Sequence, residues 1–192
     1  MGTRHLICVK LDGEYKIAQY GQWDGYPEGA GLEVLKFLRE RMETNRFTNN
    51  LRQTYLIDVK TMDKIIEEMN YHVPWSTIAK AFPAFDRDTG AEILDIVQAG
   101  KARMLVNQID FAKDSLFCEW AYVIDLDDLV FQVYKGFNKT KLEDGDRFFF
   151  LQEDECQYDG FYPVREVQSW SLFHLPDAET FLKAFEKEDE DD

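Results

Sequence analysis

The chain has 192 residues, of which 45% are hydrophobic and 15% aromatic. This is enough apolar material for one well-formed core, and the length fits one domain better than two. The formal net charge of -15 repels the phosphate backbone of nucleic acids, so direct nucleic-acid binding is disfavoured. An acidic surface is compatible with binding to a basic protein partner.

Targeting and redox signals are weak in this sequence. No segment is apolar over enough residues to span a bilayer, and the N-terminal apolar run is too short for a signal peptide. The cysteines at 8, 118 and 156 are scattered and form no CxxC pair, which argues against a zinc site or a disulfide framework. We therefore expect a cytoplasmic protein with reduced thiols, without a membrane segment and without a cofactor.

The N-terminal part predicts a β-hairpin and then helices. Residues 5–11 and 15–20 are the two strands, and Asp12-Gly13 is the turn between them. Apolar residues occupy successive positions of the first strand, which is therefore expected in the interior of its sheet. Helical spacing of apolar residues predicts a helix over 32–42, and a second short helix is expected over 47–56.

The middle third is expected to be mostly helical. Thr61 is the predicted N-cap of one helix, and Pro74 and Pro83 bracket the next. A third helix is expected to begin at a cap formed by Asp88 or Thr89 and to end near Gly100.

In the last third of the chain, the pattern of apolar residues changes from the helical period to that of strands. Residues 116–137 predict a second β-hairpin with its turn at Asp127-Asp128, and residues 147–151 and 161–173 predict further strands. Asp177 is expected to cap a final helix. The order of elements predicts an α+β fold, with an antiparallel sheet built from N- and C-terminal strands and a helical middle segment packed on one face.

The predicted domain covers residues 1–185. Residues 186–192 read EKEDEDD, a run of like charges that cannot bury apolar area and is therefore predicted to be a disordered acidic tail.

The stretch from 19 to 31, QYGQWDGYPEGAG, has two interpretations. In the structural one, Asp24-Gly25 is a turn, the glycines let the chain approach the sheet, and Trp23 and Tyr26 anchor the core. In the functional one, polar Gln19, Gln22 and Asp24 stand among the aromatic Trp23 and Tyr26. Such a mixture suits a small, polar, nucleotide-like ligand.

Arg4 is a further candidate for the same site. It opens the first strand, and its guanidinium would hold a phosphate or carboxylate of the ligand. The alternative is an ordinary ion pair with one of the 37 acidic residues, which we consider the better explanation.

A hydrolase is the first alternative function, with Asp24, Asp114 or Glu119 as the base or as metal ligands. The acidic runs at 86–88 and 125–128 lack the spacing of a calcium loop, and cap and turn roles explain them, so no metal site is predicted. The second alternative is an acidic inhibitor that covers a basic protein surface.

Several strings of the sequence are distinctive, namely MGTRHLICV, AQYGQWDGYPEGAG, RDTGAEIL, DSLFCEWAYVIDLD and VYKGFN. In these strings the chain resembles a family of uncharacterised proteins found in phage and fungal genomes. The resemblance implies a free-standing intracellular accessory protein, and it implies no activity and no catalytic residue. By genome context, phage accessory proteins often bind signalling nucleotides or host proteins. The favoured hypothesis is therefore a binding protein whose ligand contacts the 19–31 stretch, with Arg4 as a further candidate contact.

Overall fold

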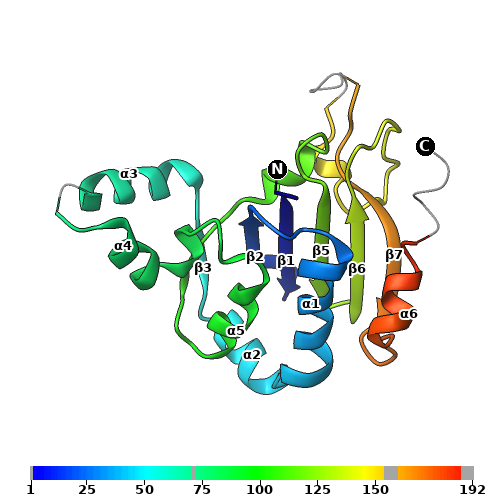
Figure 1. Ribbon diagram of the computed structural model, residues 1–192, viewed down its shortest axis with the longest axis horizontal. Coiled ribbons are helices and arrows are strands. Elements are labelled where there is room, and N and C mark those ends of the chain that lie inside the picture. The colour runs from blue at the N-terminus through cyan, green and yellow to red at the C-terminus, as the bar shows by residue number, and fades with distance from the viewer. Residues whose placement is uncertain (1, 71, 154–159, 187–192) are drawn as a thin grey trace.

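The computed structural model describes residues 2–70, 72–153 and 160–186. They form a mixed α+β fold around a five-stranded, mostly antiparallel sheet (Figure 1). No helix in these ranges is both long and apolar enough to cross a membrane. Apart from Glu186, the predicted acidic tail lies outside the described residues, as does Cys156.

The large sheet has the strand order β2-β1-β5-β6-β7. Its strands are β1 (His5–Leu11), β2 (Glu14–Gly21), β5 (Trp120–Asp125), β6 (Val130–Lys135) and β7 (Arg165–Ser171). β1 lies between β2 and β5, so the prediction of an interior first strand is confirmed. The β1–β5 pair is parallel, with His5 opposite Trp120, so the predicted antiparallel sheet is antiparallel in its other pairs but not in this one. β2 brings the chain back to the edge of the sheet where β1 begins, since Gly21 lies opposite His5, and the segment that follows β2 returns to the same edge, so β5 runs parallel to β1.

The helical segments are more broken than the sequence predicts. A continuous run of helical turns covers Pro27–Gly31, α1 (Leu32–Lys36) and Phe37–Arg41. The other helices are α2 (Thr44–Leu51), α3 (Val59–Asn70), α4 (Trp75–Ala81), α5 (Ile93–Gln98) and α6 (Ala178–Lys183). Short 3-10 turns cover Pro83–Phe85, Gly90–Glu92 and Ile109–Lys113.

Two predicted elements have a different structure. The segment expected to be helical to residue 56 ends earlier, because β3 (Tyr55–Ile57) pairs in parallel with β4 (Met104–Val106) in a separate small sheet. Residues 147–151, predicted as a strand, contain the 3-10 helix Phe149–Leu151 instead. In this segment Phe148 and Leu151 are buried and Phe149 and Phe150 are exposed, a pattern that does not alternate as a strand does.

The caps and turns of the hairpins and helices follow local chemistry. Asp12 and Gly13 have φ of 56° and 79°, as expected for the two positions of a tight hairpin turn. The Asp177 carboxylate accepts a hydrogen bond from the backbone N–H of Thr180 at 2.8 Å, so this predicted cap is confirmed. The predicted cap Thr61 is wrong, because Asp58 accepts the backbone N–H of Thr61 at 2.6 Å and so performs that role for α3.

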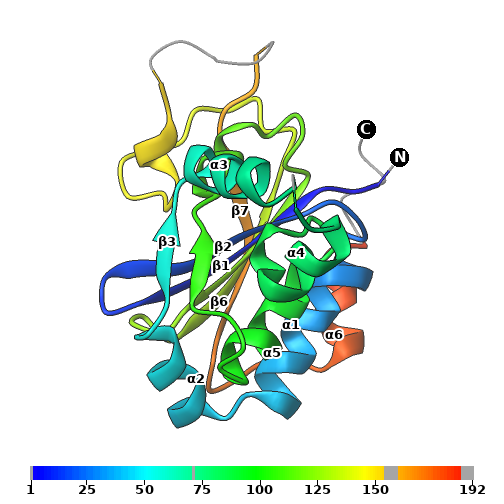
Figure 2. The same ribbon diagram turned by 90° about the vertical axis from the view of Figure 1, so that its left-hand side faces the viewer.

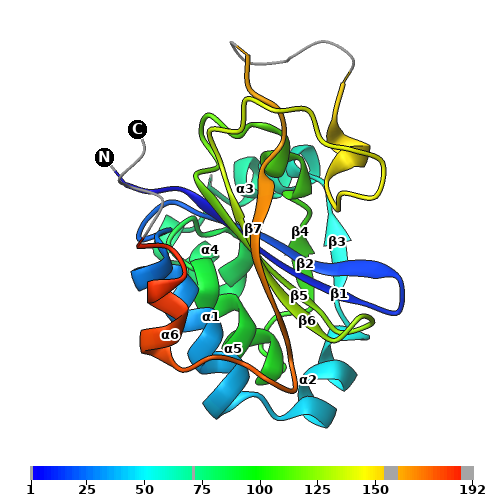
Figure 3. The same cartoon turned by 90° about the vertical axis from the view of Figure 1, so that its right-hand side faces the viewer.

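Each face of the large sheet is covered by a separate core. Ile7 and Val9 of β1 point into the core under α1, α5 and α6, which stack on one side of the sheet (Figures 2 and 3). Leu6 and Cys8 point into a second core on the opposite face, which turns and loops within residues 109–118 and 142–151, together with Val164, cover. Helices α1, α5 and α6 therefore cover one face, and the other face is also buried, which explains why β1 is apolar at each position from Leu6 to Val9.

Helices α3 and α4 form a lobe that projects from the body of the protein beside β2 (Figure 1). A third and smaller apolar cluster holds this lobe. It is centred on Ile78, Phe85 and Val106.

Candidate functional site

The 19–31 stretch connects the end of β2 to the first helical turn. Asp24 lies in the left-handed region with φ of 55°, and its backbone carbonyl accepts the N–H of Ala30 at 2.7 Å. Gly25 is needed for a different reason, because a Cβ there would lie 2.7 Å from the carbonyl oxygen of Thr3. Gly31 does let the chain approach the sheet, since its Cβ would lie 3.0 Å from the ring of Tyr122.

The aromatic residues of this stretch are on the surface. Trp23 is 55% exposed and Tyr26 is 52% exposed, so the interpretation of both as core anchors is wrong. The Trp23 indole N–H donates a hydrogen bond to Asp88 at 2.9 Å, and this contact connects the stretch to a loop that is distant in the sequence.

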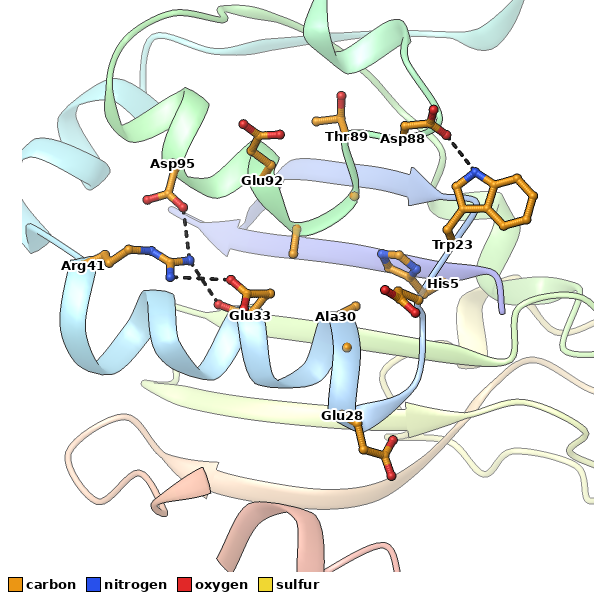
Figure 4. A pocket seen from close by; sticks show the side chains of 14 residues that line it. His5, Trp23, Glu28, Ala30, Glu33, Arg41, Asp88, Thr89, Glu92 and Asp95 are labelled. Carbon is orange, nitrogen blue, oxygen red and sulfur yellow. Dashed lines mark hydrogen bonds and ion pairs between the residues drawn. The ribbon is translucent and has the colours of Figure 1, made fainter. Parts of the chain in front are cut away.

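A cleft of about 740 Å³ lies between this stretch and the segment that leads into α5. One wall is the helical run that carries Glu28, Ala30 and Glu33, and the opposite wall is the 88–95 segment (Figure 4). The Trp23–Asp88 hydrogen bond bridges the walls at one end. At the other end Arg41 forms ion pairs with Glu33 and Asp95, at 3.6 and 3.1 Å (Figure 4). We call this hollow the His5 cleft.

His5, the first residue of β1, contributes its imidazole to the lining of the cleft. The side chain is 2% exposed, and neither ring nitrogen forms a hydrogen bond of normal distance and angle with the described residues, although a looser contact with the Thr3 backbone acts on the ring. Glycines make room for it, because a Cβ on Gly21 would lie 2.2 Å from the ring and a Cβ on Gly90 would lie 3.1 Å from Nε2. Burial lowers the pKa of His5 to about 4, although the Thr3 backbone and the Asp24 carboxylate oppose the shift. The imidazole is therefore neutral at pH 7.

The electrostatic character of the His5 cleft is strongly acidic. Its carboxylates are those of Asp24, Glu28, Glu33, Asp88, Glu92 and Asp95, and among the described residues Arg41 is the one basic side chain in its lining. Asp24, Glu28 and Glu92 form no side-chain hydrogen bond or ion pair within the described part of the chain. Their charge is uncompensated, so the cleft attracts cations and repels anions.

The structure separates the residues predicted to contact a ligand. Trp23 and Asp24 line the His5 cleft, whereas Gln19 is buried and donates to the backbone carbonyl of Tyr20 at 3.0 Å. Gln22 accepts a hydrogen bond from the Tyr20 hydroxyl at 2.8 Å. Tyr26 lines a different hollow of about 400 Å³, together with Glu119.

Arg4 is also outside the His5 cleft. Its guanidinium lies over the ring of Phe117, 4.4 Å from the centroid, and its backbone N–H donates to Glu119 at 3.3 Å. It forms no ion pair with any residue that the structure describes, so the expected ordinary ion pair is wrong. A cation over an aromatic face is a stabilising arrangement that needs no carboxylate.

The residues suggested for a hydrolase do not form one site. Asp24 lines the His5 cleft and Glu119 lines the hollow at Tyr26. Asp114 lines neither of these hollows, and burial raises the pKa of its carboxyl. Within residues 2–70, 72–153 and 160–186, no three His, Cys, Asp or Glu side chains are grouped so as to hold a metal ion.

Sequence reasoning did not identify most of the cleft. His5, Glu28, Glu33, Arg41, Glu92 and Asp95 were not among the predicted ligand contacts. A histidine at the start of a mostly apolar central strand was the available signal, because such a position is buried and its ring needs partners. The comparisons with known proteins identify no relative, since no family model, curated protein or solved structure matches the chain.

Proposed function

We propose that the protein binds a small polar ligand in the His5 cleft, and that this ligand is a cation with N–H donors, such as a primary amine or a guanidine. The observation that carries the proposal is the pair of buried, unpartnered ring nitrogens of His5 beside a cleft with six carboxylates. Buried polar groups normally have hydrogen-bond partners. A bound ligand is a partner that the fold itself does not supply.

The chemistry of the lining suits such a ligand. A neutral imidazole offers one acceptor and one donor, and it does not repel a positive charge. Asp24 and Glu92 offer carboxylates with no other partner among the described residues. The exposed indole of Trp23, at one end of the cleft, offers an aromatic face to the cation.

The same lining restricts which of the nucleotide-like compounds suggested by the sequence the cleft would accept. The phosphates of a nucleotide would meet uncompensated carboxylates, so the cleft favours a positively charged compound over a phosphorylated one. The proposal also includes an accessory role in the cell, which the resemblance to phage and fungal proteins implies. A ligand-binding function is compatible with such a role.

Isothermal titration calorimetry at low ionic strength tests the proposal with agmatine, which carries both an amine and a guanidine. Spermidine, adenosine and AMP are the comparison compounds. We expect agmatine to bind and AMP to fail. The His5→Leu variant keeps the net charge but removes both ring nitrogens, and it should weaken binding about tenfold. Asp24→Asn and Glu92→Gln should each weaken it about fivefold.

The matched control is Glu40→Gln, which removes a charge from the same helical run at an exposed position outside the cleft. It should leave agmatine binding unchanged. If His5→Leu binds as wild type does, and Glu40→Gln weakens binding as much as Asp24→Asn, the attraction is only that of an acidic surface and the proposal is wrong.

A further inference from the structure

A second hollow lies on the other side of the 86–88 loop, between the α3–α4 lobe and the body of the protein. It has a volume of about 790 Å³, and we call it the α3 groove. Its apolar lining includes Val59, Met62 and Ile66 of α3, Trp75 at the start of α4, and Phe85. Asp88 lines both hollows, so the two share one loop.

One face of α3 forms a wall of the groove. Val59, Met62, Asp63 and Ile66 follow the spacing i, i+3, i+4, i+7, which places them side by side on a helix. Val59 is 42% exposed, and Trp75 across the groove is also 42% exposed. Exposed apolar side chains gathered in a hollow are typical of a docking surface.

The polar rim of the groove determines which partner fits. Asp63, Asp86 and Asp88 carry three negative charges, and Arg87 is the one basic residue of the lining in the part of the chain that the structure describes. Asp63 forms no hydrogen bond or ion pair with the described residues. The whole chain has a net charge of -15, so a second copy would be repelled.

We propose that the α3 groove binds a basic amphipathic segment of a partner protein. Apolar side chains of that segment would contact Met62, Ile66 and Trp75, and its lysine or arginine side chains would lie near Asp63 and Asp86. A methionine side chain is flexible and polarizable, so Met62 suits a surface that adapts to its partner. Helix-in-groove recognition of this kind uses apolar anchors and a charged rim.

Fluorescence anisotropy with a labelled Leu/Lys amphipathic peptide tests the groove, and a peptide with glutamate in place of lysine is the charge comparison. We expect the Leu/Lys peptide to bind and the Leu/Glu peptide to fail. Trp75→Ala and Asp63→Lys should each weaken binding about tenfold. The matched controls are Phe173→Ala and Asp144→Lys, which alter an aromatic and a carboxylate that are exposed and outside the groove, and they should bind as wild type does.

A second measurement does not depend on a folded variant. In the wild-type protein with labelled methionine methyl groups, saturation with the Leu/Lys peptide should shift the NMR signal of Met62 and leave that of Met42, which packs in the main core, in place. An unshifted Met62 signal at saturation would overturn the proposal, as would equal binding by Asp63→Lys and Asp144→Lys. Neither result bears on the His5 cleft, because these variants leave its lining intact.

Discussion

Two buried ionisable side chains of the large sheet differ in their surroundings. Asp125, at the end of β5, is 0% exposed, and His5, at the start of β1, is 2% exposed. Asp125 accepts the backbone N–H groups of Asp127 and Asp128 at 3.0 Å each, and it pairs with Arg147 at 2.7 Å and Lys10 at 3.3 Å. His5 has no such partner in the residues that the structure describes.

The pKa shifts of the two groups reflect this difference. Burial raises the pKa of Asp125, but the N–H of Asp128 and the Arg147 guanidinium outweigh burial and hold the pKa below its usual value. Burial dominates at His5 and lowers its pKa to about 4. The fold alone accounts for Asp125 as a structural residue, whereas the buried position of His5 costs stability that, in the proposed function, a bound ligand would offset.

The largest expected effect comes from breaking the Asp125 cluster. Arg147→Met removes the nearest cation and leaves a buried carboxylate, so the free energy of unfolding should fall by about 3–5 kcal/mol. Urea denaturation measures the change. Adding Asp125→Asn to this variant should restore part of the loss, because the uncompensated charge is then gone. A change of less than about 1 kcal/mol in the single variant would show that Lys10 and the backbone N–H groups of Asp127 and Asp128 are enough to support the carboxylate.

The pH dependence of stability should sharpen the contrast at His5. Its pKa is about 4 in the folded protein and 6.5 in the unfolded chain, so the unfolded chain binds more protons between these values. Lowering the pH from 6.5 to 4 should therefore cost about 3 kcal/mol through this residue. The stability difference between wild type and His5→Leu, measured by denaturation across this range, isolates the effect. A difference that does not vary with pH would contradict the neutral, buried imidazole.

At pH 7 the His5→Leu variant should be more stable than wild type. The substitution replaces two unpartnered polar atoms by apolar ones of similar size, which should add about 1–2 kcal/mol to the free energy of unfolding. Thermal and urea unfolding in ligand-free buffer both report it. Destabilisation instead would mean that the imidazole has a partner in the free protein and resembles Asp125 after all.

The smallest effect on stability is expected at Asp24. Its φ of 55° suits Asn as well as Asp, so Asp24→Asn should change the free energy of unfolding by less than about 0.5 kcal/mol. Asp24→Ala is the backbone control and should cost about 1 kcal/mol, because alanine is strained in that conformation. Equal stability of the two variants would show that the turn does not depend on this φ.

Part of the candidate site was predictable because its signals are local. Trp23 and Asp24 stand in a glycine-rich connection between a strand and a helix, where backbone geometry and exposed side chains follow from neighbouring residues. The opposite wall begins at Asp88, and no periodicity or turn signal relates it to Trp23. The six residues predicted to contact a ligand are therefore separated in the structure. Trp23 and Asp24 line the cleft, Gln19 is buried, and Arg4, Gln22 and Tyr26 lie outside the cleft.

The sequence by itself determined the N-terminal hairpin, the interior position of β1, the Asp177 cap and the α+β class. Each of these depends on short-range chemistry, such as turn residues that accept positive φ or apolar residues at successive positions of a strand. Only the tertiary structure decided the parallel pairing of β1 with β5, the strands β3 and β4, and the cleft around His5. These features depend on which segments, distant from one another in the sequence, pack together. The free energy that favours this packing comes from residues throughout the core.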